Sequence, residues 1–260
     1  MVSHLNGFRL ARFRLTALAR ERLALPEYKG SALRGGFGHV FRKIGCMASS
    51  LGAGECTLRE RCPYHYIFET PPPAGSQILS NVPTAPQPFV LEPPLDTKRF
   101  YEPGEELTFG LVLIGRAIDY LPYFIYAFDE LGRNGIGKGK GKYQLGAVTS
   151  VDGDGKQTQI YWPEKHLLKD GFSILKAVDL FSPLPLEGGE DQGEEVRSLC
   201  NGTLTLHFLT PTRIKYGEHL TDSPEFHVLF RSLLRRISLL NYFHCDGELH
   251  PAPRPLIEKA

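Results

Sequence analysis

A segment of strictly alternating apolar residues most restricts what this chain can fold into. Residues 107–113 place leucine or phenylalanine at every second position, which is the period of a strand with one buried face. In residues 33–44 and again in 124–131, apolar residues recur mainly at steps of three and four, which is the stripe of an amphipathic helix. Strand and helix signals therefore alternate along the chain, and we predict a mixed α+β fold.

Further apolar runs complete the order of elements expected for residues 7–150. They are strand-like segments at Phe8–Leu18 (with a phase slip near Ala11, as in a bulged strand), Tyr64–Glu69, Pro88–Leu91 and Tyr143–Val148. Helices are expected near 29–45 and 119–131, the second capped by Asp119 with Pro122 in its first turn. The order is β-α-β-β-α-β, the ferredoxin-like plan. We expect a four-stranded antiparallel sheet with both helices on one face.

The rest of the chain predicts a second unit that begins and does not finish. A turn-rich passage at 152–155 marks the boundary, so the domains are expected at 1–150 and 151–260. Gly202–Leu209 reads as a strand, and Ser223 followed by Pro224 is typical of a helix start. The buried stripe expected for that helix consists of Phe226, Leu229, Phe230, Leu233, Leu234, Ile237 and Leu240.

The stretch from Gly135 to Leu145, GIGKGKGKYQL, carries the clearest functional signal. Its four glycines alternate with lysines at positions 138, 140 and 142. In an extended backbone this spacing puts three ammonium groups on one edge and bare main chain on the other, which suits a phosphate-bearing polyanion. A Walker A loop is excluded because Gly139 stands where Ser or Thr would ligate magnesium. The alternative interpretation is a flexible, solvated turn.

Charge is distributed unevenly although the net charge is only +1. Residues 1–44 hold nine Lys or Arg against Glu21 and Glu27, and acidic residues gather in Glu187–Glu195. The N-terminus has no uninterrupted apolar core, so it does not predict a signal peptide, and no apolar run is long enough to span a membrane. We therefore expect a cytoplasmic protein with reduced thiols.

Two groups of side chains could support chemistry. His39 falls on the polar side of the first expected helix, so it is either a catalytic group or a solvated surface imidazole. Cys46, Cys56, Cys62 and His65 have a spacing that could complete a tetrahedral zinc site, but free thiols are the favoured interpretation. Residues 46–62 and the proline-rich 71–94 are expected insertions. We predict no bound metal and no cofactor.

Several longer stretches resemble one family. They are YKGSALRGGFGHVFRKIGC, CTLRERCPYHYIFE, PFVLEPP, LIGRAIDYLPYFIYAFDELGRNGIGKGKGKYQL, FLTPTRIK and FHVLFRSLLRRISLL. In this order they resemble the CRISPR-associated RAMP endoribonuclease that processes precursor CRISPR RNA. The resemblance spans about residues 8–245. It implies tandem ferredoxin-like domains, of which the second is incomplete in this chain.

The resemblance also implies an activity and a set of residues. The 2′-hydroxyl attacks the adjacent phosphate without metal and leaves a 2′,3′-cyclic phosphate. His39 matches the family's catalytic histidine, with Tyr28 and Lys43 as neighbouring catalytic candidates. The residues implied in RNA binding are Lys29, Arg34, Arg42, Gly135, Gly137, Lys138, Gly139, Lys140, Gly141, Lys142, Arg213 and Lys215. Precursor CRISPR RNA is the expected partner, and other CRISPR effector subunits and a second copy of the chain are further ones.

Two alternatives remain open at this stage. A non-catalytic RAMP subunit would bind CRISPR RNA as a scaffold and would need no histidine on the first helix. An unrelated interaction module built around Cys46–His65 would bind zinc and no RNA. Zinc content, RNA affinity and cleavage of repeat RNA in EDTA distinguish the three.

Overall fold

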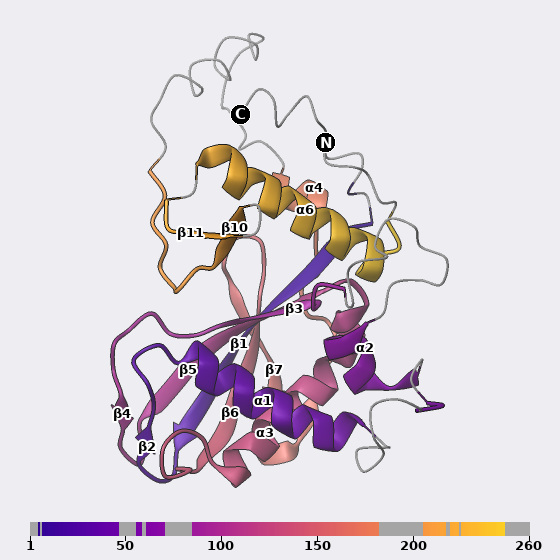
Figure 1. Ribbon diagram of the computed structural model, residues 1–260. Helices are drawn as coiled ribbons and strands as arrows, with labels where there is room; N and C mark the ends of the chain where they lie inside the picture. The colour runs from indigo at the N-terminus through magenta and orange to yellow at the C-terminus, as the bar shows by residue number, and fades with distance from the viewer. Residues whose placement is uncertain are drawn as a thin grey trace, which may run out of the picture.

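An antiparallel sheet runs through the centre of the protein (Figure 1). The computed structural model describes residues 5, 7–46, 56–58, 61–70, 85–181, 205–216, 219–223 and 225–247. The order of the central strands is β3-β5-β1-β6, and every neighbouring pair is antiparallel. Their bounds are β1 Arg9–Ala19, β3 Phe89–Glu92, β5 Glu106–Ile114 and β6 Tyr143–Val151. The mixed α and β architecture with an antiparallel sheet is therefore confirmed.

The sheet continues beyond the strands that the sequence predicts. Strand β7 (Gln157–Trp162) pairs with β6, and β8 (Leu167–Leu168) pairs with β7. A further short strand, β9 (Leu175–Lys176), pairs with the start of β1. The sheet thus runs past the boundary expected at residue 150, while the division of the chain into two domains stays a prediction.

The alternation in β1 decides which face of the sheet is covered. Ala11, Phe13, Leu15 and Ala17 are buried, whereas Arg12 and Arg14 are exposed on the other face. The irregularity expected near Ala11 lies instead between Leu15 and Ala17, where the pairing with β6 shifts its register. The apolar pattern of β1 alone does not show that its pairing with β6 is the one whose register shifts.

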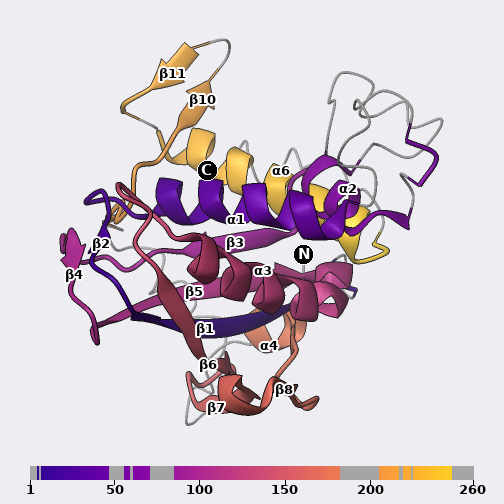
Figure 2. The ribbon, with the colours of Figure 1, turned by 90° about the horizontal axis from the view of Figure 1, so that it is seen from below.

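Two helices cover the buried face, as predicted. Helix α1 (Gly30–Gly45) and helix α3 (Leu121–Asn134) lie side by side on it (Figures 1 and 2). Asp119 does not cap α3, because it lies in the short 3₁₀ helix η4 (Gly115–Tyr120) that leads into that helix, and Tyr120 takes the capping position without a side-chain bond. Pro122 does lie in the first turn.

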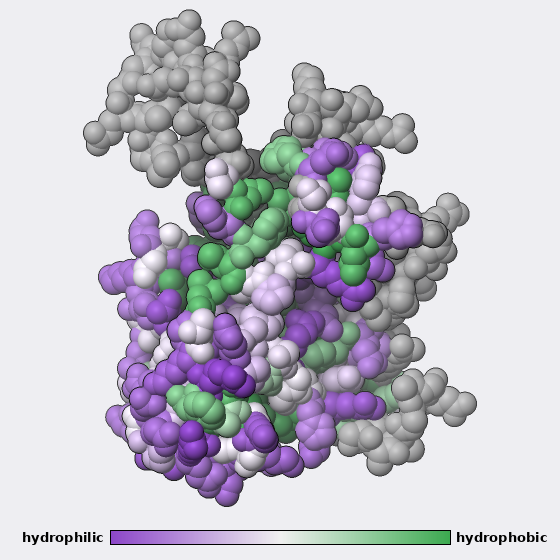
Figure 3. Space-filling view, turned by 60° about the vertical axis from the view of Figure 1, so that its left-hand side comes forward, coloured by the Kyte–Doolittle hydropathy of each residue, from purple (hydrophilic) through white to green (hydrophobic). Residues whose placement is uncertain are grey.

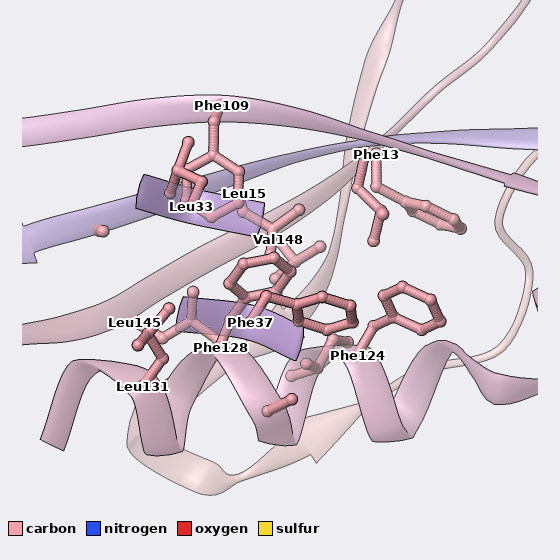
Figure 4. Close-up of a cluster of buried hydrophobic side chains, with 14 of the residues drawn as sticks. Phe13, Leu15, Leu33, Phe37, Phe109, Phe124, Phe128, Leu131, Leu145 and Val148 are labelled. Atoms are coloured by element: carbon pink, nitrogen blue, oxygen red, sulfur yellow. The ribbon is translucent and has the colours of Figure 1, made fainter. Parts of the chain in front are cut away.

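Phe37 of α1 occupies the middle of the core (Figure 4). Its ring stacks on those of Phe128 and Phe124 at centroid distances of 4.8 and 5.0 Å, and Phe89 meets it edge-on at 5.5 Å. Such ring pairs are favourable beyond the area they bury. Gly36 allows the close approach of the two helices, since a Cβ there would lie 2.8 Å from a methyl of Leu131.

The segment Tyr64–Glu69 is not a strand. It belongs to helix α2 (Pro63–Glu69), which has Pro63 in its first turn. Tyr64 and Phe68 stack at 5.1 Å one turn apart, and Ile67 is fully buried. The prediction was wrong because aromatic residues at alternate positions satisfy a strand pattern as well as a helical one.

The C-terminal elements differ most from expectation. Helix α6 (Phe226–His244) begins after Glu225, which makes no side-chain cap, so Ser223 does not cap it, and Pro224 lies outside the described residues. Residues 205–209 form no strand. Short elements elsewhere in the chain are β2 Leu23–Ala24 and β4 Phe100–Tyr101, which pair with each other. In the C-terminal part they are α4 Ala177–Phe181, β10 Ile214–Tyr216 and β11 His219–Thr221.

The predicted buried stripe of α6 is only partly buried. Leu240 is covered by Phe8 and Ile114, but Phe226 and Leu233 are each half exposed. Figure 3 shows hydrophobic surface over the upper part of the molecule, where α6 and the β10–β11 hairpin lie. The reason is that Phe8, Ile114 and Tyr66 contact the C-terminal part of α6, whereas the described residues beside its N-terminal part are those of a two-stranded hairpin.

A buried histidine, His244, holds the C-terminal end of α6 against Tyr66 and Pro86. His244 Nδ1 lies 3.1 Å from the Tyr66 hydroxyl, and Nε2 lies 2.8 Å from the Pro86 carbonyl oxygen. Burial lowers the pKa of His244 to about 4, so the ring is neutral at neutral pH. The Nε2–H donates to Pro86, and Nδ1 accepts from Tyr66.

No helix among the described residues is long and apolar enough to cross a membrane.

We expect Phe37→Ala to lower the free energy of unfolding by about 3–5 kcal/mol, because it removes the ring at the centre of the core. The measurement is urea unfolding. Leu95→Ala is the control, since Leu95 is 61% exposed and its truncation should change stability by less than about 0.5 kcal/mol. Equal losses in both variants would contradict this account of the core.

Candidate nucleic-acid interface

The glycine–lysine stretch forms a closed turn between α3 and β6. The Ile136 amide donates to the Gly141 carbonyl oxygen at 2.9 Å, and the two residues form an isolated antiparallel bridge. Backbone φ is positive at Gly135, Gly137 and Gly139 and also at Lys140. The extended backbone expected from the alternation is therefore wrong: the glycines permit left-handed turns.

This turn is docked on the backbone of β2. The Lys138 amide donates to the Ala24 carbonyl oxygen at 2.9 Å. A Cβ at Gly137 would lie 2.2 Å from that same oxygen, and one at Gly141 would lie 2.3 Å from the Arg22 carbonyl oxygen. Gly139, by contrast, faces open space. With Gly135, whose added Cβ would lie 2.0 Å from the Lys140 carbonyl oxygen, three of the glycines serve packing within the protein, and the tip at Gly139 is free to meet a partner.

The three lysines of the turn are not equivalent. Lys142 pairs with Glu21 at 3.7 Å, and its amide donates to the same carboxylate at 3.2 Å. Lys138 and Lys140 are exposed, and neither makes an ion pair with a described residue. The tip of the turn therefore presents two uncompensated positive charges.

Two neighbouring cations are already neutralised. Arg22 pairs with Glu102 at 3.1 Å and Lys98 with Glu105 at 2.9 Å, whereas Arg20 donates to the neutral Gln144 side chain and keeps its charge. Exposed pairs of this kind contribute little stability, but they reduce the local positive potential. Lys138 and Lys140, together with Arg20, therefore carry the uncompensated positive charge of this region.

Lys29 does not belong to an exposed interface, which corrects its expected role in RNA binding. Its side chain is fully buried, and its ammonium donates to Asp96 Oδ1 at 3.0 Å, the Asp96 carbonyl at 2.8 Å and the Glu27 carbonyl at 3.3 Å. All three N–H donors are thereby used. Lys29 ties the start of α1 to the connection between β3 and β4.

The expected catalytic residues occupy different parts of α1. His39 is exposed and hydrogen-bonds to no described residue, and Lys43 lies one turn further along. The Tyr28 hydroxyl lies against Gly30, where it would meet an added Cβ at 2.4 Å. Gly30 and His39 are nine positions apart in the helix, which is about 14 Å along its axis. Tyr28 and His39 are thus too far apart to act on one phosphate together.

The remaining arginine and lysine candidates lie away from the turn. Arg34 donates to the Gln87 side chain and lies 5.4 Å from the Phe89 ring centre, and Arg42 lies 5.6 Å from that of Tyr64. Both therefore lie on the side of α1 that faces α2 and β3. Arg213 and Lys215 are exposed at the β10–β11 hairpin. The described contacts bring none of these four to the glycine turn.

The cysteines that could have bound metal do not form a cluster with a third ligand. The Cys62 thiol lies beside Cys46 and donates to the Gly45 carbonyl at 3.3 Å, and its pKa is raised chiefly by burial. His65 lies 3.4 Å from Glu69. Within the described ranges, no group of three or more His, Cys, Asp or Glu side chains is arranged to hold a metal ion.

Sequence reasoning missed the residues that hold the turn in place. Glu21 and the Ala24 carbonyl are more than a hundred positions from the lysines they contact, and β2 is only two residues long. No periodic signal marks so short a strand. The pairing of Glu21 with Lys142 is a tertiary effect without a local pattern.

Two known protein families match parts of this sequence, and together the two matches cover most of the chain. Residues 8–172, more than half of it, match the family AF_1859_N, described as an N-terminal domain. The chain belongs to this family. Residues 206–258, about a fifth of the chain, match the family described as CRISPR-associated endoribonuclease Cas6. The second match is partial, and it supports a CRISPR-associated family for this AF_1859_N protein.

A relative of the AF_1859_N protein comes from Archaeoglobus fulgidus. It is described as an uncharacterized protein and is 28% identical over 129 residues. The alignment covers 49% of this chain and 42% of the relative. The chain thus matches less than half of the relative's length.

We expect Asp96→Asn to lower the free energy of unfolding at pH 7 by about 1–3 kcal/mol, because it removes the charged acceptor of buried Lys29. Burial alone would raise the pKa of Asp96, but hydrogen bonds from Lys29 and the Lys98 amide outweigh it and lower that pKa. The stabilisation is therefore present above the unfolded pKa of about 3.9 and lost as the pH falls through the lower, folded pKa.

Urea unfolding as a function of pH measures this difference. Asp170→Asn is the control, since Asp170 is exposed and pairs with no described residue. A difference between wild type and Asp96→Asn that persisted unchanged in acid would contradict the proposed pair.

Proposed function

We propose that the protein is a metal-independent endoribonuclease that cleaves precursor CRISPR RNA within its repeats. The match of residues 206–258 to the Cas6 family carries this proposal. The residue patterns that resemble the RAMP endoribonucleases extend over both parts of the chain. In this proposal residues 1–150 and 151–260 belong to two ferredoxin-like domains, and the protein works in the cytoplasm.

The glycine–lysine turn is the proposed contact to the RNA backbone. Lys138 and Lys140 are exposed and unpaired among the described residues, and the turn beneath them is fixed by its bond to Ala24. Because the backbone of the turn is already ordered, binding a phosphate there costs only the ordering of the two lysine side chains. Lysine lacks the planar fork that reads a base edge, so the contribution of this turn is independent of sequence.

The proposed chemistry needs a base, an acid and a stabilising charge. The base takes the proton of the 2′-hydroxyl, whose oxygen attacks the adjacent phosphorus, and the acid gives a proton to the departing 5′-oxygen. The products are a 2′,3′-cyclic phosphate and a 5′-hydroxyl. His39 is the proposed proton carrier, and Lys43, one turn away, is placed to stabilise charge on the phosphorane.

A second candidate function is a CRISPR-RNA-binding subunit that cuts nothing. The observation that favours it is the setting of His39, because no described residue hydrogen-bonds to the ring and orients it. A catalytic histidine is usually held by such a partner. Other effector subunits or a second copy of the chain would then be its partners.

The two functions differ in one experiment. The full chain is incubated with its own repeat RNA in EDTA, and the ends of the products are mapped. We expect a single cut with a 2′,3′-cyclic phosphate, and we expect His39→Ala to slow single-turnover cleavage by about 10²–10⁴-fold with RNA binding unchanged. Lys43→Gln should slow cleavage less, and Tyr28→Phe should leave it unchanged.

Binding without any cut in EDTA would support the subunit that binds RNA without cleaving it. Cleavage that survives His39→Ala unchanged would remove His39 from the mechanism.

The turn predicts a specific dependence on salt. Each phosphate neutralised on a single strand adds roughly 0.7 to the slope of log affinity against log salt. Replacing Lys138 and Lys140 together with glutamine should therefore flatten the slope by about 1.4, by similar amounts for cognate and scrambled RNA. Lys142→Gln is the matched control, and it should change the slope less because Lys142 already pairs with Glu21. An unchanged slope in the double variant would mean that the turn does not touch RNA.

A further inference from the structure

A cavity of about 370 Å³ opens between α3 and the β7–β8 edge of the sheet. Its volume falls within the roughly 300–1,000 Å³ typical of small-molecule sites. Its lining combines apolar and polar side chains. The ones that matter here are Ile125, Tyr126, Asp129, Arg133, Tyr161 and Leu168.

The polar groups of this cavity have bonding capacity left over. Tyr161 is only 7% exposed, yet its hydroxyl hydrogen-bonds to no described residue. Burial and then the Asp129 carboxylate raise the pKa of Tyr161, so the hydroxyl keeps its proton at neutral pH. Asp129 accepts from Arg133 through Oδ2 at 2.6 Å, and its Oδ1 has no hydrogen-bond partner among the described residues. Two residues that line the same cavity thus retain an acceptor and a donor without a hydrogen-bond partner among the described residues.

An aromatic ring is also available there. Tyr126 lines the cavity, is 52% exposed and contacts no other described ring. Tyr123, one turn earlier in α3 and 42% exposed, instead packs on Tyr120 at 5.9 Å and on Phe41 at 6.4 Å. A planar ligand could stack on Tyr126 without displacing any protein contact.

We propose that this cavity binds an unstacked guanine base. Guanine is the base whose Watson–Crick edge carries two adjacent N–H donors next to a carbonyl acceptor. The donors suit the Asp129 carboxylate, and the acceptor suits the Tyr161 hydroxyl. Adenine and cytosine carry one donor group beside acceptors on this edge, so they would present an acceptor to the carboxylate.

The position of the cavity connects it with the RNA contact, and in this respect the inference rests on the proposed function. The cavity extends along α3 from Pro122 in the first turn to Arg133 in the last, and the glycine turn starts two residues after Arg133. Figure 2 shows the helix leading into that turn. A single strand whose phosphates meet Lys138 and Lys140 would have its neighbouring bases near this end of α3. The cavity would then supply the base selectivity that the lysines lack.

The test uses free guanosine, which has no phosphate and therefore does not engage the lysines. Guanosine, inosine and uridine are titrated into the full chain, and binding is followed by isothermal titration calorimetry. Inosine lacks the exocyclic amine, so we expect it to bind at least about tenfold more weakly than guanosine, as for a lost hydrogen bond to a charged group.

Variants separate the contributions of the cavity. Tyr126→Leu should weaken guanosine binding by about fivefold or more, because it removes the stacking ring. Tyr161→Phe keeps the buried ring and should weaken binding by about two- to tenfold. Tyr123→Leu is the matched control on the same helix and should bind as wild type does. Both leucine variants replace exposed side chains, so both should remain folded.

Equal binding of guanosine, inosine and uridine would overturn the inference, and so would equal effects of Tyr126→Leu and Tyr123→Leu. Failure here with intact cleavage of repeat RNA would remove the cavity and leave the proposed function. Selective guanosine binding by a chain that neither binds nor cuts repeat RNA would keep the cavity and remove the proposed function.

Discussion

The packing of Phe37 between α3 and the sheet is the contact on which the rest of the structure depends. It stacks on two rings of α3 and meets a third on β3, so one side chain fixes the distance between three elements. Gly36 beside it removes the Cβ that would hold the helices apart. Because α1 and α3 cannot slide past this cluster, the ends of both helices have fixed positions. The glycine–lysine turn begins directly after α3, so the packing of Phe37 against that helix also determines where the turn lies.

The fixed position of the turn has consequences for what it can bind. A flexible loop with three lysines would lose entropy on meeting a polyanion, whereas this turn is already closed by its own bridge and bonded to Ala24. The same docking brings Lys142 to Glu21 and leaves Lys138 and Lys140 exposed. Selectivity among anions then has to come from groups nearby. The Tyr161 hydroxyl and the second oxygen of the Asp129 carboxylate, at the cavity along α3, are groups with this capacity.

Periodic segments could be predicted from the sequence, and contacts between distant segments could not. The strand at 107–113, the helix near 29–45 and the order β-α-β-β-α-β rest on repeated burial of one face, which a pattern records. Tyr64–Glu69 was misassigned because its aromatic residues satisfy two periods at once. The buried state of Lys29 depends on Asp96, 67 residues away, and no local rule gives a lysine such a partner. For α6, the predicted stripe exists, but its burial depends on elements elsewhere in the chain.

The glycines of the turn show how far composition alone can mislead. Because the glycines alternate with lysines, the sequence suggests that all four leave the main chain exposed for contact with a ligand. In the structure a Cβ at Gly137 or Gly141 would collide with the carbonyls of residues 24 and 22, and one at Gly135 would collide with the Lys140 carbonyl, so these three are required by the protein's own packing. Of the four, only Gly139, with φ of +86° and no atom within 4 Å of a Cβ added there, has the geometry expected of a ligand contact. The functional surface is therefore the short tip from Lys138 to Lys140. A phosphate that approaches this tip meets two ammonium groups, and the backbone that carries them is held in place by the Ile136–Gly141 bridge and by the bond to Ala24.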